Sequence, residues 1–199
     1  MKLFRGKYRI ESVRLEGYNY SSPGSYFVTI NTKGRACWFG EVVGGEMQSS
    51  EIGNIVLEEW VKTPTIRPTV TLDEFQIMPN HFHGIVVIHD SESAARLGQI
   101  PFVDWETSVN INTVETHSRA SLQQQRNTNQ NQFGPQRNNL GSIIRGFKSA
   151  CTTRIHSAGF PNFAWQARFW DRIIRDQGEL ERIRKYIIDN PMKWGMKRE

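Results

Sequence analysis

The sequence predicts an α+β domain with the element order strand, helix, strand, strand, helix, strand, and one further helix at the end. Apolar residues, many of them β-branched or aromatic, gather in four short segments that are typical of strands. In three other segments, apolar residues recur at helical spacing. The 199 residues are enough for one domain with a full hydrophobic core.

The chain begins with a lead-in, a strand and a hairpin. Residues 1–25 are polar and rich in turn residues, which predicts irregular structure. The apolar segment 26–31 predicts the first strand. Residues 37–48 are typical of a small hairpin, with its turn at Gly44 and Gly45.

A helix and two strands follow the hairpin. The helix begins after Ser49 or Ser50, either of which can cap it, and it ends before Pro64. Strands are predicted over 70–78 and over 81–89, and the second is apolar enough to be buried.

The sequence then changes character. Eleven of the nineteen residues from 121 to 139 are Gln or Asn. We therefore expect residues 90–139 to be a low-complexity insertion within the single domain 1–199. A second amphipathic helix is predicted over 140–155, where the apolar spacing returns.

The chain closes with a strand and a helix. The aromatic segment 165–174 ends in the fourth strand, and the last helix spans 177–190. Pro191 ends that helix, because the residue before a proline is disfavoured in the helical region. The whole order matches a ferredoxin-like βαββαβ sandwich with an added C-terminal helix.

Composition limits the possible environments and partners. No apolar run is long enough to span a bilayer, and the basic N-terminus lacks the apolar core of a signal peptide, so we expect a cytoplasmic protein without membrane partners. Cys37 and Cys151 show no metal or redox spacing and are expected to be free thiols. From Gly141 to Glu199 there are twelve Lys and Arg against six Asp and Glu. This basic excess can meet a polyanion or can simply be a solvated face.

Two histidines stand at the start of the buried strand. Side chains alternate along a strand, so His81 and His83 point to one face and Phe82 points to the other. Two imidazoles on one face can chelate a metal ion. They can equally be polar residues at the mouth of a strand.

The last helix offers a second pair of polar side chains. Tyr186 and Asn190 are four positions apart and share one helical face. Tyr186 provides a phenol, and Asn190 provides an amide oxygen that can bind a metal. Alternatively, Tyr186 is a half-buried core aromatic, and Asn190 with Pro191 is a stop signal.

Taken together, these motifs resemble the single-tyrosine HUH transposases, in particular the branch associated with repetitive extragenic palindromes (REP). Three blocks carry the resemblance: MPNHFH over 78–83, WQARFWDRIIR over 165–175 and YIIDNP over 186–191. The segments 18–60 and 141–150 are also similar to the family. The resemblance covers nearly everything except the Gln/Asn-rich insertion.

The resemblance implies that Tyr186 attacks a phosphodiester in single-stranded or hairpin DNA, forms a 5′-phosphotyrosine link and releases a 3′-hydroxyl. It also implies that His81, His83 and Asn190 hold a divalent ion, Mg or Mn, that stabilises the developing charge. The candidates for phosphate contacts are Arg145, Lys148, Arg168, Arg172, Arg175, Arg182, Arg184 and Lys185. Trp165, Phe169 and Trp170 can stack on unpaired bases, or Trp165 and Trp170 can belong to the core.

Three functions stay open on the sequence alone. The first is a DNA-nicking and joining enzyme that acts at hairpin-forming repeats. The second is a hairpin-binding protein of the same fold that no longer turns over. The third is an unrelated metal hydrolase that uses His81 and His83 and does not need Tyr186. The chain can act as a monomer, or as a homodimer that exchanges the tyrosine helix.

Overall fold

The chain is organised around a four-stranded antiparallel sheet. The computed structural model describes residues 3–4, 7–8, 15, 17–97 and 139–194. The sheet contains the strands β3 (Gly24–Asn31), β6 (Val70–Met78), β7 (His81–Ile88) and β8 (Trp170–Ile174). Their spatial order is β6-β7-β3-β8, and every neighbouring pair is antiparallel. The strands predicted for the sheet are therefore all present, within two residues of the expected bounds at most ends.

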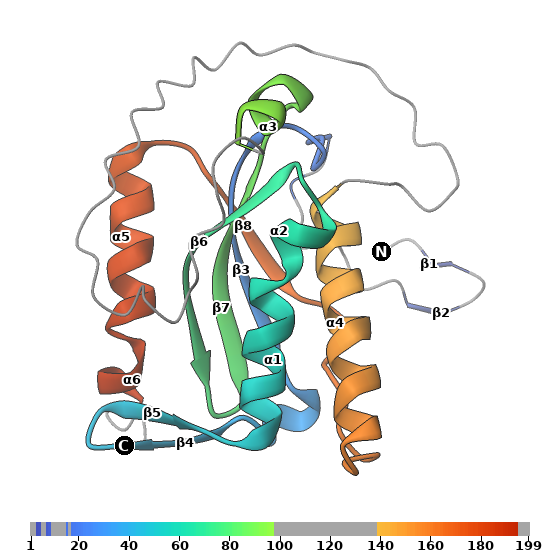
Figure 1. Cartoon of the computed structure of the whole chain (residues 1–199), viewed down its shortest axis with the longest axis vertical. Helices are drawn as coiled ribbons and strands as arrows, with labels where there is room; N and C mark the ends of the chain where they lie inside the picture. The colour runs from blue at the N-terminus through green and yellow to red at the C-terminus, as the bar shows by residue number, and fades with distance from the viewer. Residues whose placement is uncertain (1–2, 5–6, 9–14, 16, 98–138, 195–199) are drawn as a thin grey trace.

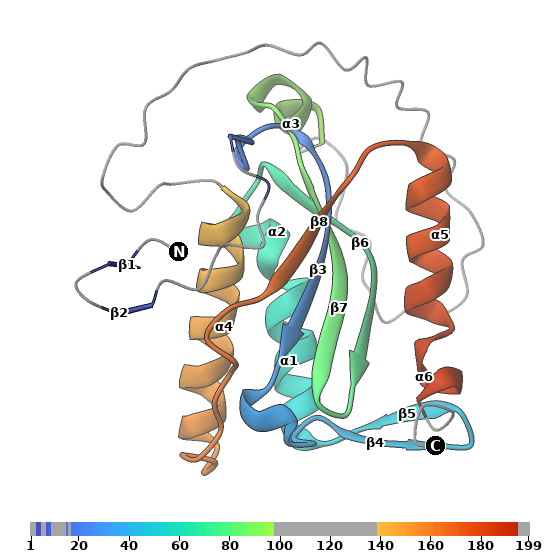
Figure 2. The same ribbon diagram turned by 180° about the vertical axis from the view of Figure 1, so that it is seen from behind.

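Helices cover both faces of this sheet. The helices α1 (Glu51–Val61) and α4 (Leu140–Ser157) pack against each other and on one face. The helix α5 (Gln177–Ile188) covers the other face (Figures 1 and 2). The core under α1 and α4 contains Tyr26, Val28, Ile30, Phe82, Val86 and the apolar stripes of both helices. A smaller cluster under α5 joins Phe27 and Ile85 to Ile187.

The strand β7 lies close beneath α1. Phe82 is fully buried, with its ring centre 4.6 Å from that of Trp60. A Cβ on Gly84 would come within 2.6 Å of the Trp60 ring and 2.8 Å of the Phe82 ring. Only glycine allows this approach, and the close packing fixes the strand that carries the two histidines.

Local signals placed the hairpin and the first helix correctly. The hairpin consists of β4 (Gly40–Val43) and β5 (Glu46–Ser49), and Gly44 and Gly45 adopt positive φ angles of 62° and 86° in its turn. Both angles suit a residue without a Cβ and are typical of a tight hairpin turn. Ser50 caps α1 by accepting a hydrogen bond from the Gly53 amide at 3.1 Å.

Other segments depart from the sequence-based expectations. The lead-in contains a small ladder of β1 (Leu3–Phe4) and β2 (Lys7–Tyr8). The helix α2 (Thr63–Ile66) includes Pro64 in its first turn. A proline is tolerated there, because the backbone N–H groups of the first turn have no partner within the helix. The helix α3 (Ser91–Leu97) occupies the start of the predicted insertion, whose residues 98–138 lie outside the described residues.

Two predictions about the environment of the chain can be compared with the structure. Cys37 and Cys151 are both free thiols, as expected. In the described ranges, every helix is too short or too polar to cross a bilayer.

Candidate active site

The two histidines of β7 lie on the face of the sheet that α5 covers. Their side chains are largely buried, with exposed fractions of 8% for His81 and 4% for His83. The two Nε2 atoms are 3.1 Å apart. Strand alternation therefore brings the two imidazoles together, with their Nε2 atoms at one point.

The other ring nitrogen of each histidine contacts a side-chain oxygen. Asn80 Oδ1 lies 2.8 Å from His81 Nδ1, and Asn80 Nδ2 donates to the Arg35 carbonyl at 3.1 Å. Because this second bond orients the Asn80 amide, its oxygen accepts from His81, and the proton of neutral His81 sits on Nδ1. His81 Nε2 then presents a lone pair.

His83 is held in a different way. Its Nδ1 lies 2.9 Å from Thr29 Oγ1, and a hydroxyl can either donate or accept. His83 can therefore donate from Nε2 to His81, or carry its proton on Nδ1 and present a second lone pair. The Thr29 hydroxyl serves both tautomers without a change of rotamer.

Tyr186 stands over this pair. Its hydroxyl lies 3.4 Å from His83 Nε2, and its ring packs edge-on against Phe27 with ring centres 6.0 Å apart. The side chain is 40% exposed, so the hydroxyl can be reached from solvent. The helix α5 places it there by packing Leu180, Ile183 and Ile187 on the sheet.

An ion pair also anchors α5 to the sheet. Arg184 Nε and Nη2 donate to the two carboxylate oxygens of Asp73 at 2.8 and 2.5 Å. Asp73 lies at an irregularity in the pairing of β6 with β7, between Leu72 and Phe75. Burial alone would raise the pKa of Asp73, but the hydrogen bonds from Arg184 and from the Glu74 amide outweigh it and hold this pKa below its usual value.

This depressed pKa predicts a pH-dependent anchor. Asp73→Asn should lower the free energy of unfolding by about 1 kcal/mol at pH 7. The contribution is complete above the unfolded pKa of about 4 and is lost as the pH falls through the lower folded value. Urea titrations at several pH values measure it, with Glu46→Gln as an exposed control. A difference from wild type that stays constant below pH 4 would contradict the ionic origin.

Asn190 does not lie on the same helix as Tyr186, so this part of the prediction is wrong. The helix α5 ends at Ile188, and Asn190 begins the short helix α6 (Asn190–Lys193). Pro191 does not end a helix either, because it occupies the first turn of α6, where its missing N–H is not needed. Asn190 nevertheless lines the same pocket as Tyr186 and the two histidines.

The pocket around these residues has a volume of about 760 Å³. Its basic side chains are Arg35 and Lys193, and its aromatic walls include Trp170 and Trp194. Thr29 and Asn31 of β3 also line it. Of these residues, only Trp170 was singled out from the sequence, as a candidate for base stacking. Period-two alternation places Thr29 and Asn31 on one face of their strand, but it does not reveal that β7 is the neighbour of that strand.

The donors in this pocket fit a divalent ion. Two imidazole Nε2 atoms converge, each ring is held by a second side chain, and amide oxygens lie nearby. Within the described part of the chain there is no group of three or more His, Cys, Asp or Glu side chains suited to a metal. An ion here would be held by two imidazoles and neutral oxygens, without a carboxylate.

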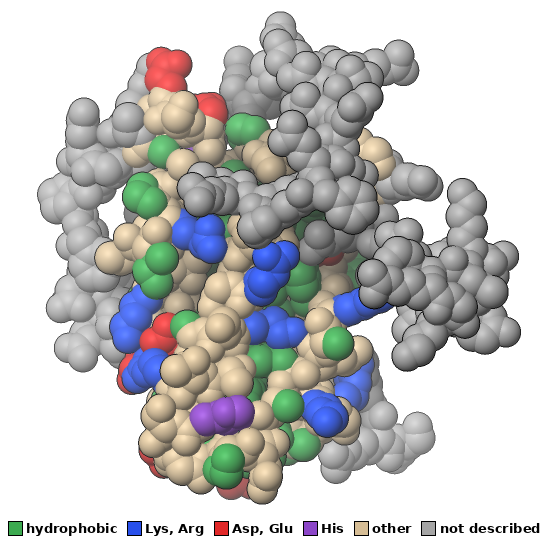
Figure 3. Space-filling view, turned by 90° about the vertical axis from the view of Figure 1, so that its right-hand side faces the viewer, with side chains coloured by type: hydrophobic (Ala, Val, Ile, Leu, Met, Phe, Trp, Pro, Cys, Tyr) green, Lys and Arg blue, Asp and Glu red, His purple; other side chains and the backbone are tan. Residues whose placement is uncertain are grey.

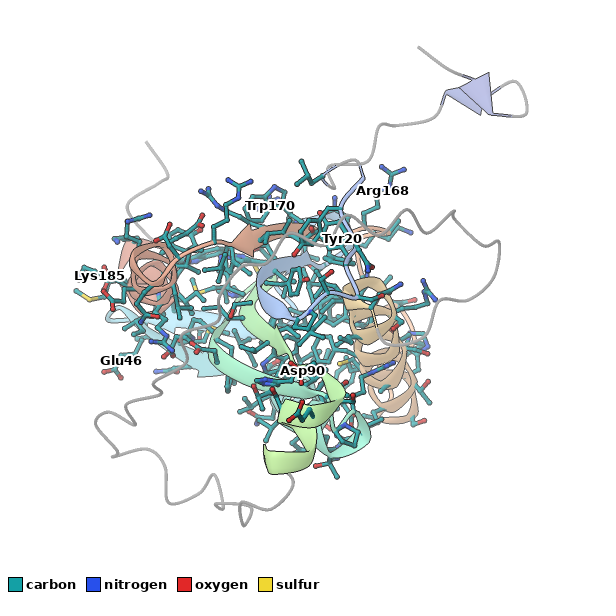
Figure 4. All side chains as sticks on the ribbon, turned by 90° about the horizontal axis from the view of Figure 1, so that it is seen from above. Tyr20, Glu46, Asp90, Arg168, Trp170 and Lys185 are labelled. Carbon is teal, nitrogen blue, oxygen red and sulfur yellow. The ribbon has the colours of Figure 1, made fainter. Side chains whose placement is uncertain are left out.

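The eight predicted phosphate contacts do not form a single patch. Arg145 and Lys148 lie on α4, across the sheet from α5, and Lys148 Nζ donates to the Gln166 carbonyl at 2.5 Å. On the α4 side of the molecule, basic side chains are spread over the surface (Figure 3). Lys185 lies on the outer side of α5, and Arg168 lies far from it (Figure 4).

Several of these cations bind acidic partners of the chain itself. Arg184 pairs with Asp73, as described above, and Arg172 Nε donates to Glu179 at 2.6 Å. Both pairs hold α5 in place, which is a structural role. Arg175 and Arg182 are exposed beside them.

The three candidate stacking residues differ in how far they are buried. Trp165 and Phe169 pack against the core under α4. Trp170 is 41% exposed at the start of β8, so its expected place in the core is wrong. Figure 4 shows it between α5 and Tyr20.

Comparisons with known proteins find a relative in sequence and similar solved structures. An uncharacterized protein of Haemophilus influenzae is 34% identical over 189 residues, which cover 95% of this chain and 92% of that protein. The REP-associated tyrosine transposase bound to a REP hairpin superposes with a TM-score of 0.55 at 18% identity, over 94% of this chain and 75% of that chain. This likeness establishes a transposase-like fold. No protein-family model matches the sequence.

Proposed function

The chain belongs to the family of the Haemophilus influenzae protein, and we propose that it nicks and rejoins single-stranded DNA at hairpin-forming repeats through a 5′-phosphotyrosine intermediate. Tyr186 is the nucleophile. His81, His83 and Asn190 are the residues that would hold a divalent ion, Mg or Mn. The fold shared with a tyrosine transposase supports this assignment.

The sheet topology supports the proposal as well. The strand order β6-β7-β3-β8, with α1 and α4 on one face, is the order expected for a βαββαβ ferredoxin-like sandwich. In this arrangement the added helix α5 packs on the opposite face. Tyr186 thus meets the histidine pair of its own chain, which favours action by a single protomer.

One observation favours this proposal over the hairpin-binding protein and the metal hydrolase. The Tyr186 hydroxyl lies 3.4 Å from His83 Nε2, although 103 positions separate the two residues. His81 and Asn190 line the same pocket. A core tyrosine needs none of these neighbours, whereas a phosphoryl-transfer site needs a nucleophile next to groups that stabilise negative charge.

The chemistry is a transesterification. Tyr186 Oη attacks the phosphorus, and the Oη–P bond forms as the bond from phosphorus to the 3′ oxygen breaks. That oxygen leaves with the electron pair and takes up a proton to become a 3′-hydroxyl. The phenolic proton can pass to water, because the side chain is partly exposed. A bound divalent ion would polarise the phosphate and offset its charge.

The chain's own residues prepare the substrate for this step. Arg35 and Lys193 bring positive charge to the pocket, where it attracts the phosphodiester. Asn80 and Thr29 fix the orientation of the imidazoles. Because the phosphoester energy is kept in the tyrosine link, a 3′-hydroxyl can reverse the attack and rejoin DNA without another energy source.

Covalent capture tests the proposal. Purified protein is mixed with fluorescent hairpin oligonucleotides from the DNA that flanks its own gene, with Mn²⁺ or EDTA, and run under denaturing conditions. We expect a shifted band only with Mn²⁺, and mass spectrometry of the digested adduct should place the nucleotide on Tyr186. Native-gel binding without any covalent band would instead indicate a hairpin-binding protein that no longer turns over.

A further inference from the structure

Trp170 occupies an unusual position for a tryptophan. It is the first residue of the edge strand β8, and it is one of the few large apolar side chains in the described ranges that stay well exposed. Its ring packs edge-on against Phe27, with ring centres 5.6 Å apart at 75°. It lines the same pocket as Tyr186. A flat aromatic face is therefore presented beside the nucleophile.

The register of the sheet defines how far Trp170 lies from the histidine pair, His81 and His83. Thr29 of β3 is paired with Trp170 on one side and with His83 on the other. The three residues form one row across three strands, so the backbones of β8 and β7 are roughly 10 Å apart. A nucleotide whose phosphate approaches Tyr186 Oη from the pocket can place its base over β3 and against Trp170.

The next position on this face offers a polar partner for that base. Asn31 follows Thr29 two residues along β3 and is paired with His81. Its Oδ1 is buried in the pocket wall and accepts no hydrogen bond within the described part of the chain. A buried amide oxygen without a donor is unfavourable, and a ligand that brings an N–H group would satisfy it.

We propose that the floor of this pocket is a nucleobase subsite, in which the base next to the scissile phosphate stacks on Trp170 and donates a hydrogen bond to Asn31 Oδ1. This inference rests on the proposed function for its substrate, single-stranded DNA. It adds a residue that binds the base and a residue that reads it. Bases of an unpaired strand are commonly recognised by stacking together with hydrogen bonds to their exposed edges.

A double-mutant cycle, which combines a protein variant with an altered DNA substrate, tests the stacking on Trp170. Binding is measured for wild type, Trp170→Ala and Trp170→Phe, each with the hairpin oligonucleotide and with versions that lack one base on either side of the scissile phosphate. We expect Trp170→Ala to weaken binding roughly 5- to 100-fold and Trp170→Phe to restore most of the loss. On the substrate that lacks the stacked base, Trp170→Ala should cause no further loss.

Controls separate stacking from a loss of structure. Ile66→Ala removes another exposed apolar side chain, on α2, and should leave binding unchanged. Melting curves check that each variant is folded. Equal effects of Trp170→Ala on the intact and both base-free substrates would overturn the subsite, because Trp170 would then act only through packing.

A second arm tests base reading by Asn31. The four bases are compared at the stacked position with wild type and Asn31→Ala, and we expect the preference among bases to shrink several-fold in the variant. An unchanged preference would overturn this role. All binding is measured in a Tyr186→Phe background, which cannot form the covalent link. A wild-type protein without an adduct, together with a non-additive cycle, would reject the proposed reaction and keep the subsite.

Discussion

Replacing Tyr186 by phenylalanine is expected to abolish the covalent DNA adduct and to lower strand cleavage on the order of 10³-fold or more. The variant removes only the hydroxyl, which lies 3.4 Å from His83 Nε2. The ring contacts with Phe27 and His83 remain, so α5 should stay on the sheet. We therefore expect hairpin affinity within about twofold of wild type, because a nucleophile contributes mainly to the transition state. Denaturing gels, native gels and melting curves measure the three quantities.

A matched tyrosine makes this result specific. Tyr18→Phe removes a hydroxyl that lies 3.3 Å from Tyr26 Oη, away from the pocket, and should leave the adduct intact. If Tyr186→Phe still cleaved DNA at the wild-type rate, water would have to be the nucleophile. The protein would then be a metal hydrolase that uses His81 and His83, and the phosphotyrosine mechanism would be wrong.

Local patterns account for the parts of the site that depend on one segment. Alternation along β7 placed His81 and His83 on one face, because residues two apart in a strand must share a face. The apolar stripe of α5 was readable for the same kind of reason, from Leu180, Ile183 and Ile187. Tyr186 on that helix could be singled out as a nucleophile only because the motifs of the chain resemble those of a known family.

The parts of the site that depend on contacts between distant segments could not be predicted from the sequence. Thr29 contacts His83 because β3 is the neighbour of β7, and Arg184 binds Asp73 across 111 positions. Neither pairing leaves a periodic signal in the sequence. At least four of the predicted phosphate contacts have partners within the chain itself: Lys148, Arg172, Arg184 and Lys185.

The end of α5 shows how a local rule can mislead. Pro191 was expected to stop a helix that contained both Tyr186 and Asn190. The backbone instead breaks at Asp189, and the proline begins α6, where its fixed φ is favourable. Asn190 still lines the pocket, which it reaches as the first residue of α6.

The second large effect is expected at the histidine pair. His81→Ala and His83→Ala should each weaken Mn²⁺ binding more than the 10- to 100-fold that is typical for residues supporting a metal ligand, with a matching loss of cleavage. Because the two Nε2 atoms are 3.1 Å apart, either substitution leaves a single imidazole at the point where they converge. Isothermal titration with Mn²⁺ in the absence of DNA measures binding independently of activity. The control is His89→Ala, whose ring bonds Thr71 at 2.7 Å outside the pocket.

The hydrogen bond between His83 and Thr29 allows a graded test of metal binding. A metal-binding His83 must carry its proton on Nδ1, and Thr29 Oγ1 is the atom that accepts it. Thr29→Val keeps the shape but cannot accept, so Mn²⁺ affinity should fall about 10- to 100-fold, whereas Thr29→Ser should stay close to wild type. A melting temperature raised by Mn²⁺ in wild type, less in Thr29→Val and not at all in His83→Ala would fit this order. Equal Mn²⁺ affinity in wild type, Thr29→Val and His83→Ala would mean that the histidine pair binds no metal. Tyr186 would then have to act through Arg35 and Lys193 alone.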